Sequence, residues 1–266
     1  MLIPAHAHAR ALEALPLDAP RRYDRVRIEL PDGATSTLHA VRLDRREFRM
    51  RVVEVGELGT LARWCRATES ADAIVGGFFV RPQRAPLGEL RIDGRAIPTE
   101  PFDRPWDGVR SCVHVWGGRI RIARRFEIAA EPPGDLLQAG PLLVRDRATV
   151  VAGDSDPEGF SSGERQFDSD ITRGRYPRAA LALTRTHLIA AACEGRAASE
   201  AGMTLNELAD ALIGLGAQEA INLDGGGSAS LVHGGRLRNS PREEHGIEIV
   251  GGRPIATALV FEPQAA

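Results

Sequence analysis

Alternation of apolar and polar residues constrains the fold of this chain more than any other feature. It is clearest in three segments, at residues 26–30, 38–43 and 48–55, and a period of two is that of a strand with one buried face. Two later alternating pairs each enclose a two-residue turn, Asp93-Gly94 and Gly117-Gly118. Such dipeptides between alternating runs predict tight antiparallel hairpins. Residues 179–196 resemble a third hairpin, with its turn near Thr186.

Helical spacing is confined to two segments. Residues 58–69 place apolar side chains at helical intervals and lead into a buried apolar run at 73–79. Thr204 and Glu207 stand in a capping-box relation before the apolar face formed by Leu205, Leu208, Ala209 and Leu212. With hairpins outnumbering strand-helix units, the sequence predicts an α+β fold with a mixed, largely antiparallel β-sheet and flanking helices.

The composition, with 43% apolar and 26% charged residues, is that of an ordinary globular protein. We expect an N-terminal arm over residues 1–22 and a single domain over 23–266. A net charge of −2 gives no basis for phosphate-backbone binding, so nucleic acid is not an expected partner. No apolar run is long enough for a membrane span. The start of the chain has no signal-peptide pattern, which predicts a cytoplasmic protein, or an exported one if a leader was removed. The oligomeric state is left open.

The sequence contains no lysine, and all 34 basic residues are arginine. This excludes Schiff-base, pyridoxal-phosphate and Walker-A mechanisms, which all need a lysine amine. The three cysteines have no short spacing and are expected to be buried free thiols.

No cofactor and no metal are expected. The acidic stretch at residues 153–159 resembles a calcium loop, but Arg165 takes the position of the bidentate glutamate that such a loop needs. The stretch belongs to a polar segment, residues 153–175, that predicts a long loop. His6 and His8 have the spacing of metal-dependent hydrolases, but they lie in a proline-containing arm without a supporting strand.

The chemistry concentrates in the stretch INLDGGGSAS at residues 221–230. Three consecutive glycines after a short apolar strand allow the backbone amides to surround an anion such as phosphate. Asp224 would lie at the rim of that nest, where a carboxylate is better suited to act as a base, nucleophile or metal ligand than as a structural group. The alternative is a tight turn in which Asp224 only accepts hydrogen bonds from nearby amides.

Several segments, in order along the chain, resemble the phosphodiester glycosidase family. The segments that carry the resemblance are residues 73–79, 139–144, 176–184, 194–196, 202–231 and 252–261. The resemblance implies a soluble hydrolase of bacterial type that cleaves the glycosidic bond of a sugar-1-phosphodiester, with a substrate similar to an N-acetylglucosamine-1-phosphodiester. The expected partner is therefore a small-molecule or glycan phosphodiester.

The resemblance also implies the site residues. Asp224 and Glu194 would supply the base or nucleophile, and Arg178 with the amides of the glycine turn would hold the phosphate. The remaining substrate-binding residues implied are Gly76, Gly77, Asn222, Gly225, Gly226, Gly227, Ser228 and Arg253.

Two positions depart from the family pattern. Val75 stands where relatives have Asn, which removes a polar group, and Glu194 stands where they have Asp, which lengthens the carboxylate arm. The alternative function is therefore a non-catalytic protein that binds a glycophosphate or a cell-envelope polymer.

Overall fold

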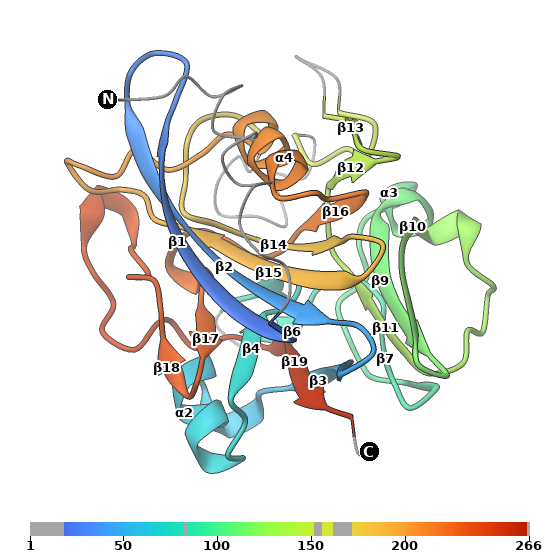
Figure 1. Cartoon of the computed structure of the whole chain (residues 1–266). Coiled ribbons are helices and arrows are strands. Elements are labelled where there is room, and N and C mark those ends of the chain that lie inside the picture. The colour runs from blue at the N-terminus through green and yellow to red at the C-terminus, as the bar shows by residue number, and fades with distance from the viewer. Residues whose placement is uncertain (1–18, 82–83, 152–155, 162–171, 265–266) are drawn as a thin grey trace.

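The computed structural model describes residues 19–81, 84–151, 156–161 and 172–264. Three β-sheets dominate it (Figure 1), and every strand pairing in these ranges is antiparallel. The expectation of a largely antiparallel sheet is confirmed, whereas the expectation of a mixed sheet is wrong for the described strands. Strands hold 43% of the described residues and helices 14%, so flanking helices are a minor part of the fold.

The largest sheet has seven strands in the order β1-β2-β15-β14-β16-β12-β13. Its members are β1 (Arg21–Glu29), β2 (Thr35–Asp44), β12 (Leu142–Arg145), β13 (Ala148–Thr149), β14 (Arg178–Leu183), β15 (His187–Cys193) and β16 (Glu219–Asn222). β1 starts at Arg21, just inside the arm that the sequence predicted over residues 1–22, and residues 1–18 lie outside the described ranges.

Two five-stranded sheets and a short hairpin complete the β structure. The second sheet, in the order β10-β9-β11-β7-β8, contains β7 (Leu90–Ile92), β8 (Arg95–Ala96), β9 (Ser111–Trp116), β10 (Arg119–Arg124) and β11 (Asp135–Gln138). The third, in the order β18-β17-β4-β19-β3, contains β3 (Phe48–Glu54), β4 (Asp72–Val75), β17 (Leu231–His233), β18 (Arg236–Leu237) and β19 (Thr257–Pro263). The hairpin is β5 (Phe79–Val80) with β6 (Ala85–Pro86).

The helices are short. They are α2 (Leu61–Ala67), α3 (Trp106–Val109), α4 (Leu205–Gly214) and the 3₁₀ turns η1 (Gly56–Leu58), η2 (Arg125–Glu127), η3 (Gly226–Ser228) and η4 (Glu244–Gly246). None of the helices in the described ranges has the length and apolar content needed to cross a membrane.

The predicted hairpin turns and the predicted helix cap are present. Asp93 and Gly94 both have positive φ (51° and 78°) in the β7-β8 turn, and Gly117 and Gly118 do the same (50° and 75°) between β9 and β10. The predicted capping box of α4 is present, since the Glu207 amide donates to Thr204 Oγ1 (3.2 Å) and the Thr204 amide donates to the Glu207 carboxylate (2.8 Å). Neighbouring residues form these turns and this cap, and the Asp93-Gly94 turn also donates to the Asp135 carboxylate (2.8 Å) and the Gly134 carbonyl (2.7 Å).

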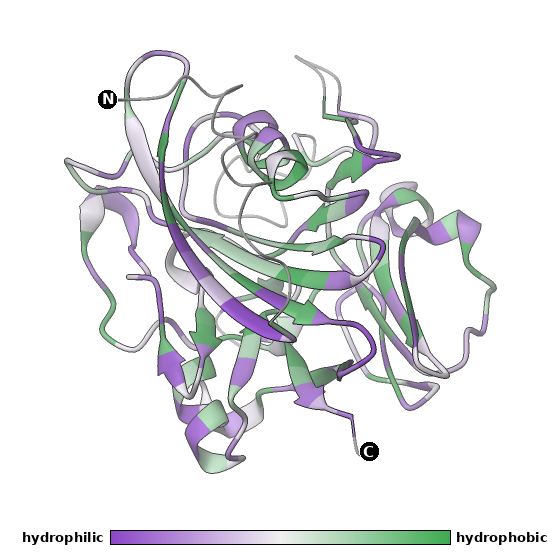
Figure 2. Ribbon diagram, in the orientation of Figure 1, coloured by the Kyte–Doolittle hydropathy of each residue, from purple (hydrophilic) through white to green (hydrophobic). Residues whose placement is uncertain are grey.

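Both faces of the central strands of the seven-stranded sheet are buried, and this explains their composition. Every residue of β14 and β15 is buried, so the two strands are continuous apolar runs rich in alanine, and Figure 2 shows them as predominantly hydrophobic. One face packs against the other two sheets. The other face packs against α4, whose Leu208 and Leu212 are fully buried. Replacing either leucine by alanine would cost about 2–5 kcal/mol of folding free energy.

Part of the predicted long loop is packed core. The Glu158 carboxylate is buried and accepts hydrogen bonds from the amides of Ser111 (2.8 Å) and Leu142 (2.8 Å), and burial raises its pKa. Asp156 accepts from the amides of Phe160 (2.9 Å) and Ser161 (2.6 Å). These carboxylates of the calcium-like stretch are therefore committed to protein amides, while residues 152–155 and 165 lie outside the described ranges, as do His6 and His8.

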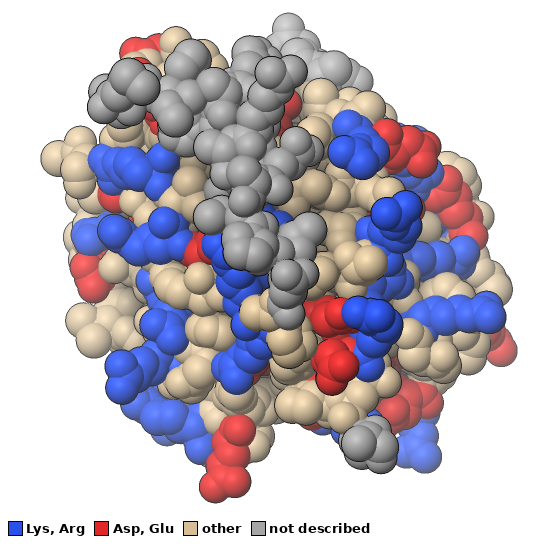
Figure 3. Space-filling model, viewed as in Figure 1, with Lys and Arg blue, Asp and Glu red and all other residues tan. Residues whose placement is uncertain are grey.

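The surface is rich in arginine. Basic side chains are spread over the face shown in Figure 3, with acidic ones between them. Exposed pairs such as Arg49–Glu262 (2.9 Å) contribute little to stability because water screens them. The three cysteines are free and buried, as expected.

Candidate active site

The candidate site lies at the termini of four strands. β4 and β16 end there, and β14 and β19 begin there. The Asp224 amide, just after β16, donates to the carbonyl of Gly76 (3.0 Å) at the end of β4. The Gly76 amide in turn donates to the carbonyl of Thr257 (2.8 Å) in β19. On the other side, the Gly226 amide donates to the carbonyl of Pro177 (2.8 Å), directly before β14. The predicted residues Gly76 and Asp224 are thus brought together.

The Asp224 carboxyl titrates closer to neutrality than an ordinary aspartate. Burial raises its pKa from 3.8 to about 6, although the Ser228 hydroxyl, the Gly225 amide and the cations of Arg253 and Arg81 all oppose the rise. The Gly225 amide donates to Asp224 Oδ1 at 2.8 Å. A carboxyl in this environment can accept or release a proton near neutral pH.

The glycine turn offers fewer free amides than the sequence predicted. The Gly225 amide is bonded to Asp224 and the Gly226 amide to Pro177, which leaves the Gly227 amide as the one of the three without an acceptor in the described ranges. Gly226 has a φ of +59°, a left-handed conformation that disfavours any side chain. The turn therefore presents one amide and a closely approachable backbone, not a nest of three donors.

Arg253 lies on one side of this turn. A methyl group placed on Gly227 would lie 3.0 Å from Nη2 of Arg253 and 2.8 Å from Cδ1 of Ile249. The guanidinium forms a two-point contact with Glu243, with Nε donating to Oε1 at 2.9 Å and Nη2 donating to Oε2. This hydrogen bonding lowers the pKa of Glu243, which is therefore an ionised second carboxylate at the site.

Arg196 lies beside the neighbouring glycine of the turn, Gly226. Its Nη1 is 3.2 Å from the position that a Gly226 side-chain carbon would take, and it donates to the carbonyl of Arg242 (3.1 Å). The guanidinium carbon is 5.4 Å from the centre of the Tyr176 ring. Arg196 and Arg253 thus flank the glycine turn, and guanidinium groups suit a phosphate because they present paired donors.

Arg178 lies near the glycine turn, but its guanidinium donates to backbone carbonyls. It is 3% exposed, with Nε donating to the carbonyl of Met203 (2.6 Å) and Nη2 to that of Gly174 (3.2 Å). Its guanidinium carbon is 5.5 Å from the Tyr176 ring, on which Arg196 also lies. These contacts fix the segment before β14 to the segment before α4.

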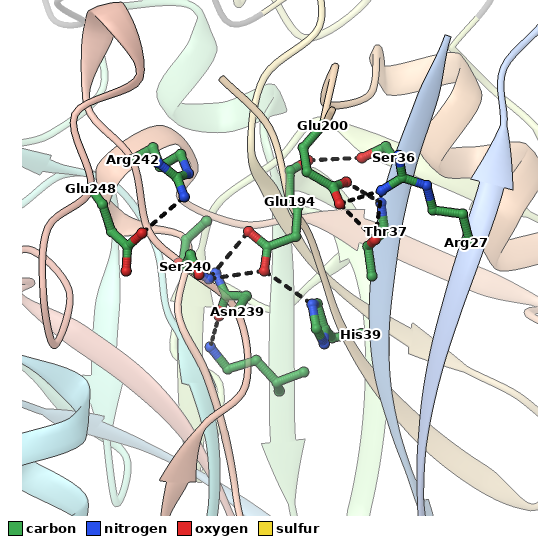
Figure 4. A network of polar contacts seen from close by, with 12 residues as sticks. Arg27, Ser36, Thr37, His39, Glu194, Glu200, Asn239, Ser240, Arg242 and Glu248 are labelled. Atoms are coloured by element: carbon green, nitrogen blue, oxygen red, sulfur yellow. Dashed lines mark hydrogen bonds and ion pairs between the residues drawn. The ribbon is translucent and has the colours of Figure 1, made fainter. Parts of the chain in front are cut away.

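Glu194 is also held by the protein itself. Its carboxylate accepts from the backbone amide of Ser240 (3.0 and 3.2 Å) and contacts Nε2 of His39 (3.1 Å), and Figure 4 shows it pointing toward these two groups. His39 Nδ1 lies 2.7 Å from the Tyr23 hydroxyl. Because a carboxylate only accepts, Nε2 of His39 donates in this contact with Glu194.

Arg178 and Glu194 lie on opposite faces of the sheet. Arg178 follows the alternation of Ala180 and Ala182 of β14, which pack in the cluster with α4, whereas Glu194 follows Ala192 of β15, which packs on the other face. Side chains alternate along a strand, so the two groups point apart. The predicted trio of Asp224, Glu194 and Arg178 does not share one face of the sheet.

The remaining predicted residues support the turn. Asn222 is 2% exposed, and its amide group donates to the carbonyls of Gly140 (3.0 Å) and Leu223 (2.8 Å), while its Oδ1 has no partner in the described ranges. The Gly77 amide donates to Oγ1 of Thr257 (3.1 Å). Val75 is fully buried in the core, so its side chain fills core space.

Three residues of the site were not singled out from the sequence. Arg196 stood inside the matched segment 194–196, two positions after the glutamate that drew attention. Glu243 and Arg81 carry no local motif, and only the fold brings their charges to Asp224 and Arg253. In the described part of the chain, no group of three or more His, Cys, Asp or Glu residues is arranged to hold a metal ion.

Comparison with known proteins shows the family to which the chain belongs. The profile of the phosphodiester glycosidase family matches residues 69–262, which include Gly76, Asp224 and Arg253, and the chain belongs to this family. No curated protein matches the sequence.

Solved structures share the fold at low sequence identity. The catalytic domain of zebrafish N-acetylglucosamine-1-phosphodiester alpha-N-acetylglucosaminidase, auto-inhibited by its pro-peptide, is 17% identical with a TM-score of 0.68, and the match covers 98% of this chain and 95% of that one. A hypothetical protein of Synechocystis is 19% identical with a TM-score of 0.61, over 91% of this chain and 62% of that one. A protein of Burkholderia pseudomallei is 16% identical with a TM-score of 0.64, over 88% and 75%. This chain therefore spans less than two thirds of the Synechocystis protein.

Proposed function

We propose that this protein is a hydrolase that cleaves the bond between the anomeric carbon of a sugar and a phosphodiester oxygen. The observation that carries the proposal is Asp224, a carboxyl whose pKa is raised to about 6, placed at a glycine turn that Arg196 and Arg253 flank. Family membership supports the same reaction class. An N-acetylglucosamine-1-phosphodiester is the substrate class that the zebrafish relative's name suggests.

The phosphate would be held at the glycine turn. Arg196 lies beside Gly226 and Arg253 beside Gly227, and the Gly227 amide adds a neutral donor. A phosphate monoester is a stable leaving group, so the reaction needs stabilisation of its charge more than proton donation. In this proposal Arg196 and Arg253 hold the phosphate, the role that the sequence suggested for Arg178. Arg178 instead helps to position the turn.

The sugar would lie against Asp224. The C1–O bond breaks with its electron pair going to the phosphate, water supplies the oxygen of the new C1 hydroxyl, and Asp224 accepts the proton that water loses or first attacks C1 itself. The Glu243 carboxylate, ionised beside Arg253, adds negative charge near the oxocarbenium-like centre. Glu194 takes a positioning role through Ser240.

Isotope labelling tests which bond breaks. N-acetylglucosamine-1-phosphate methyl ester is turned over in ¹⁸O-enriched water, and the product methyl phosphate is examined by ³¹P NMR. Cleavage at C1 leaves the methyl phosphate unlabelled, whereas attack at phosphorus places ¹⁸O in it and refutes the glycosidase assignment. The anomeric configuration of the fresh sugar then separates the two roles of Asp224, because a nucleophile retains it and a base inverts it.

Two variants control this experiment. Asp224→Asn should abolish turnover, whereas Asp146→Asn, at an exposed carboxyl in the β12-β13 turn, should leave it unchanged. Binding of the methyl ester without turnover, with the same affinity in Asp224→Ala, would instead identify a glycophosphate-binding protein.

A further inference from the structure

Large apolar side chains are exposed at few places in the described part of the chain, and two of these places are in one loop. Ile247 is 65% exposed and Val250 is 92% exposed, and Phe126 in η2 is 64% exposed. A single exposed apolar residue is ordinary for a soluble protein. Two of them, three positions apart and beside a candidate active site, call for an explanation.

The loop that carries them borders the glycine turn. Ile249, between the two exposed residues, has its Cδ1 2.8 Å from the position that a Gly227 side-chain carbon would take. The Ile247 carbonyl accepts from the amide of Glu243 (2.8 Å), the residue that pairs with Arg253. The Arg253 amide at the end of the loop donates to the carbonyl of Gly227 (3.2 Å).

The backbone of this loop is fixed by hydrogen bonds. The Ile249 amide donates to the carbonyl of Pro241 (2.9 Å), and the Gly252 amide donates to the carbonyl of Ile249 (2.9 Å). Arg242 pairs with Glu248 (2.8 Å) across the loop, as Figure 4 shows. The loop thus holds its apolar side chains outward at a defined place beside the phosphate position.

We propose that Ile247 and Val250 form an apolar rim that binds a hydrophobic aglycone, so that the substrate is a sugar-1-phosphate esterified with an alkyl or aryl alcohol. The inference rests on the proposed function. If the sugar lies at Asp224 and the phosphate between Arg196 and Arg253, the group beyond the phosphate extends over the loop that carries Arg253. An apolar aglycone there would cover side chains that water otherwise surrounds.

The test compares methyl and octyl esters of N-acetylglucosamine-1-phosphate, both as monomers in solution. We expect a kcat/KM at least about tenfold higher for the octyl ester, which is what the burial of roughly two methylene groups supplies. The double variant Ile247→Ser/Val250→Ser should lower kcat/KM for the octyl ester about tenfold more than for the methyl ester. Phe126→Ser, at a similarly exposed residue in η2 outside this loop, should keep the preference.

Each outcome has a clear meaning. Equal kcat/KM for the two esters in the unaltered protein, or equal loss of the preference in Phe126→Ser, overturns the inference and leaves the proposed function standing. Absence of turnover with both esters refutes the proposed function instead. If the double variant reduces sedimentation with phosphatidylcholine vesicles or dissociates a dimer while the two esters react equally, the rim is an interface and the inference is overturned.

Discussion

Asp224→Asn should make the protein more stable at neutral pH while abolishing its activity. Burial disfavours the ionised carboxyl, which is why the pKa of Asp224 is raised from 3.8 to about 6. Asparagine cannot ionise, and its side-chain oxygen can still accept the hydrogen bond from the Gly225 amide. The substitution therefore removes an unfavourable charge and keeps the local hydrogen bond.

The magnitude follows from the pKa. Each pH unit between the folded and unfolded pKa corresponds to about 1.36 kcal/mol, so ionised Asp224 lowers the free energy of unfolding at pH 7 by ~3 kcal/mol. A raised carboxyl pKa means that the unfolded chain ionises first. The unaltered protein accordingly loses stability as pH rises from about 4 to about 6, and the Asn variant does not. The advantage of the variant is absent below that window and constant above it.

Urea unfolding, followed by circular dichroism from pH 4 to pH 8, measures this difference. At pH 7 the gain corresponds to a Tm rise of roughly 6–12 °C for a chain of this size. Turnover of the sugar-1-phosphodiester is measured on the same samples, and kcat/KM of the unaltered protein should rise with pH through about 6. A variant that is no more stable at pH 7, or whose advantage does not change with pH, would refute the reasoning.

Substitutions at Glu194, Arg196 and Gly226 test the residues around Asp224, with Gly118 as a control position. Glu194→Gln should retain kcat/KM within about threefold, whereas Glu194→Ala should lower the free energy of unfolding by about 1–3 kcal/mol because the Ser240 amide loses its acceptor; a thousandfold loss of activity in the glutamine variant would restore a catalytic role. Arg196→Gln should raise KM about 10–100-fold through loss of charge-assisted hydrogen bonds, and an unchanged KM would remove Arg196 from the phosphate site. Gly226→Ala should cost about 1 kcal/mol of stability and also reduce activity, whereas Gly118→Ala, with similar φ and open space around it, should cost stability alone; equal activity in the two variants would contradict the proposed position of the turn.

The sequence predicts the parts of this structure that local chemistry decides. The turns at Asp93-Gly94 and Gly117-Gly118 and the capping box at Thr204 were predicted because a few neighbouring residues specify them. α2 starts at Leu61, later than the predicted residue 58, because Thr60 accepts from the Arg63 amide (3.3 Å) and caps the helix there. The strand order of the large sheet depends on pairings between distant segments, which no local pattern encodes.

In the candidate site, too, the sequence predicted what neighbouring residues specify and missed what distant segments bring together. Asp224 and the glycines were identified because one short stretch carries them. Glu194 was assigned to catalysis from a matched segment, but its partner amide at Ser240 lies 46 positions away, and that contact favours a positioning role. Arg196, two residues after Glu194, reaches the glycine turn instead. Glu243 is brought to the site only by its pairing with Arg253.

The hydrogen bonds that join Gly76 to Asp224 and to Thr257 have a consequence for folding. β4, which ends at Val75 directly before Gly76, pairs with β17 on one side and with β19 on the other, and both partners lie much later in the chain. Contacts of such long sequence separation form late, because the chain must first close large loops. On the ribosome, the candidate site cannot assemble until residues 257–263 have emerged. Acquisition of activity during synthesis would therefore report completion of the third sheet, well after the local hairpins have formed.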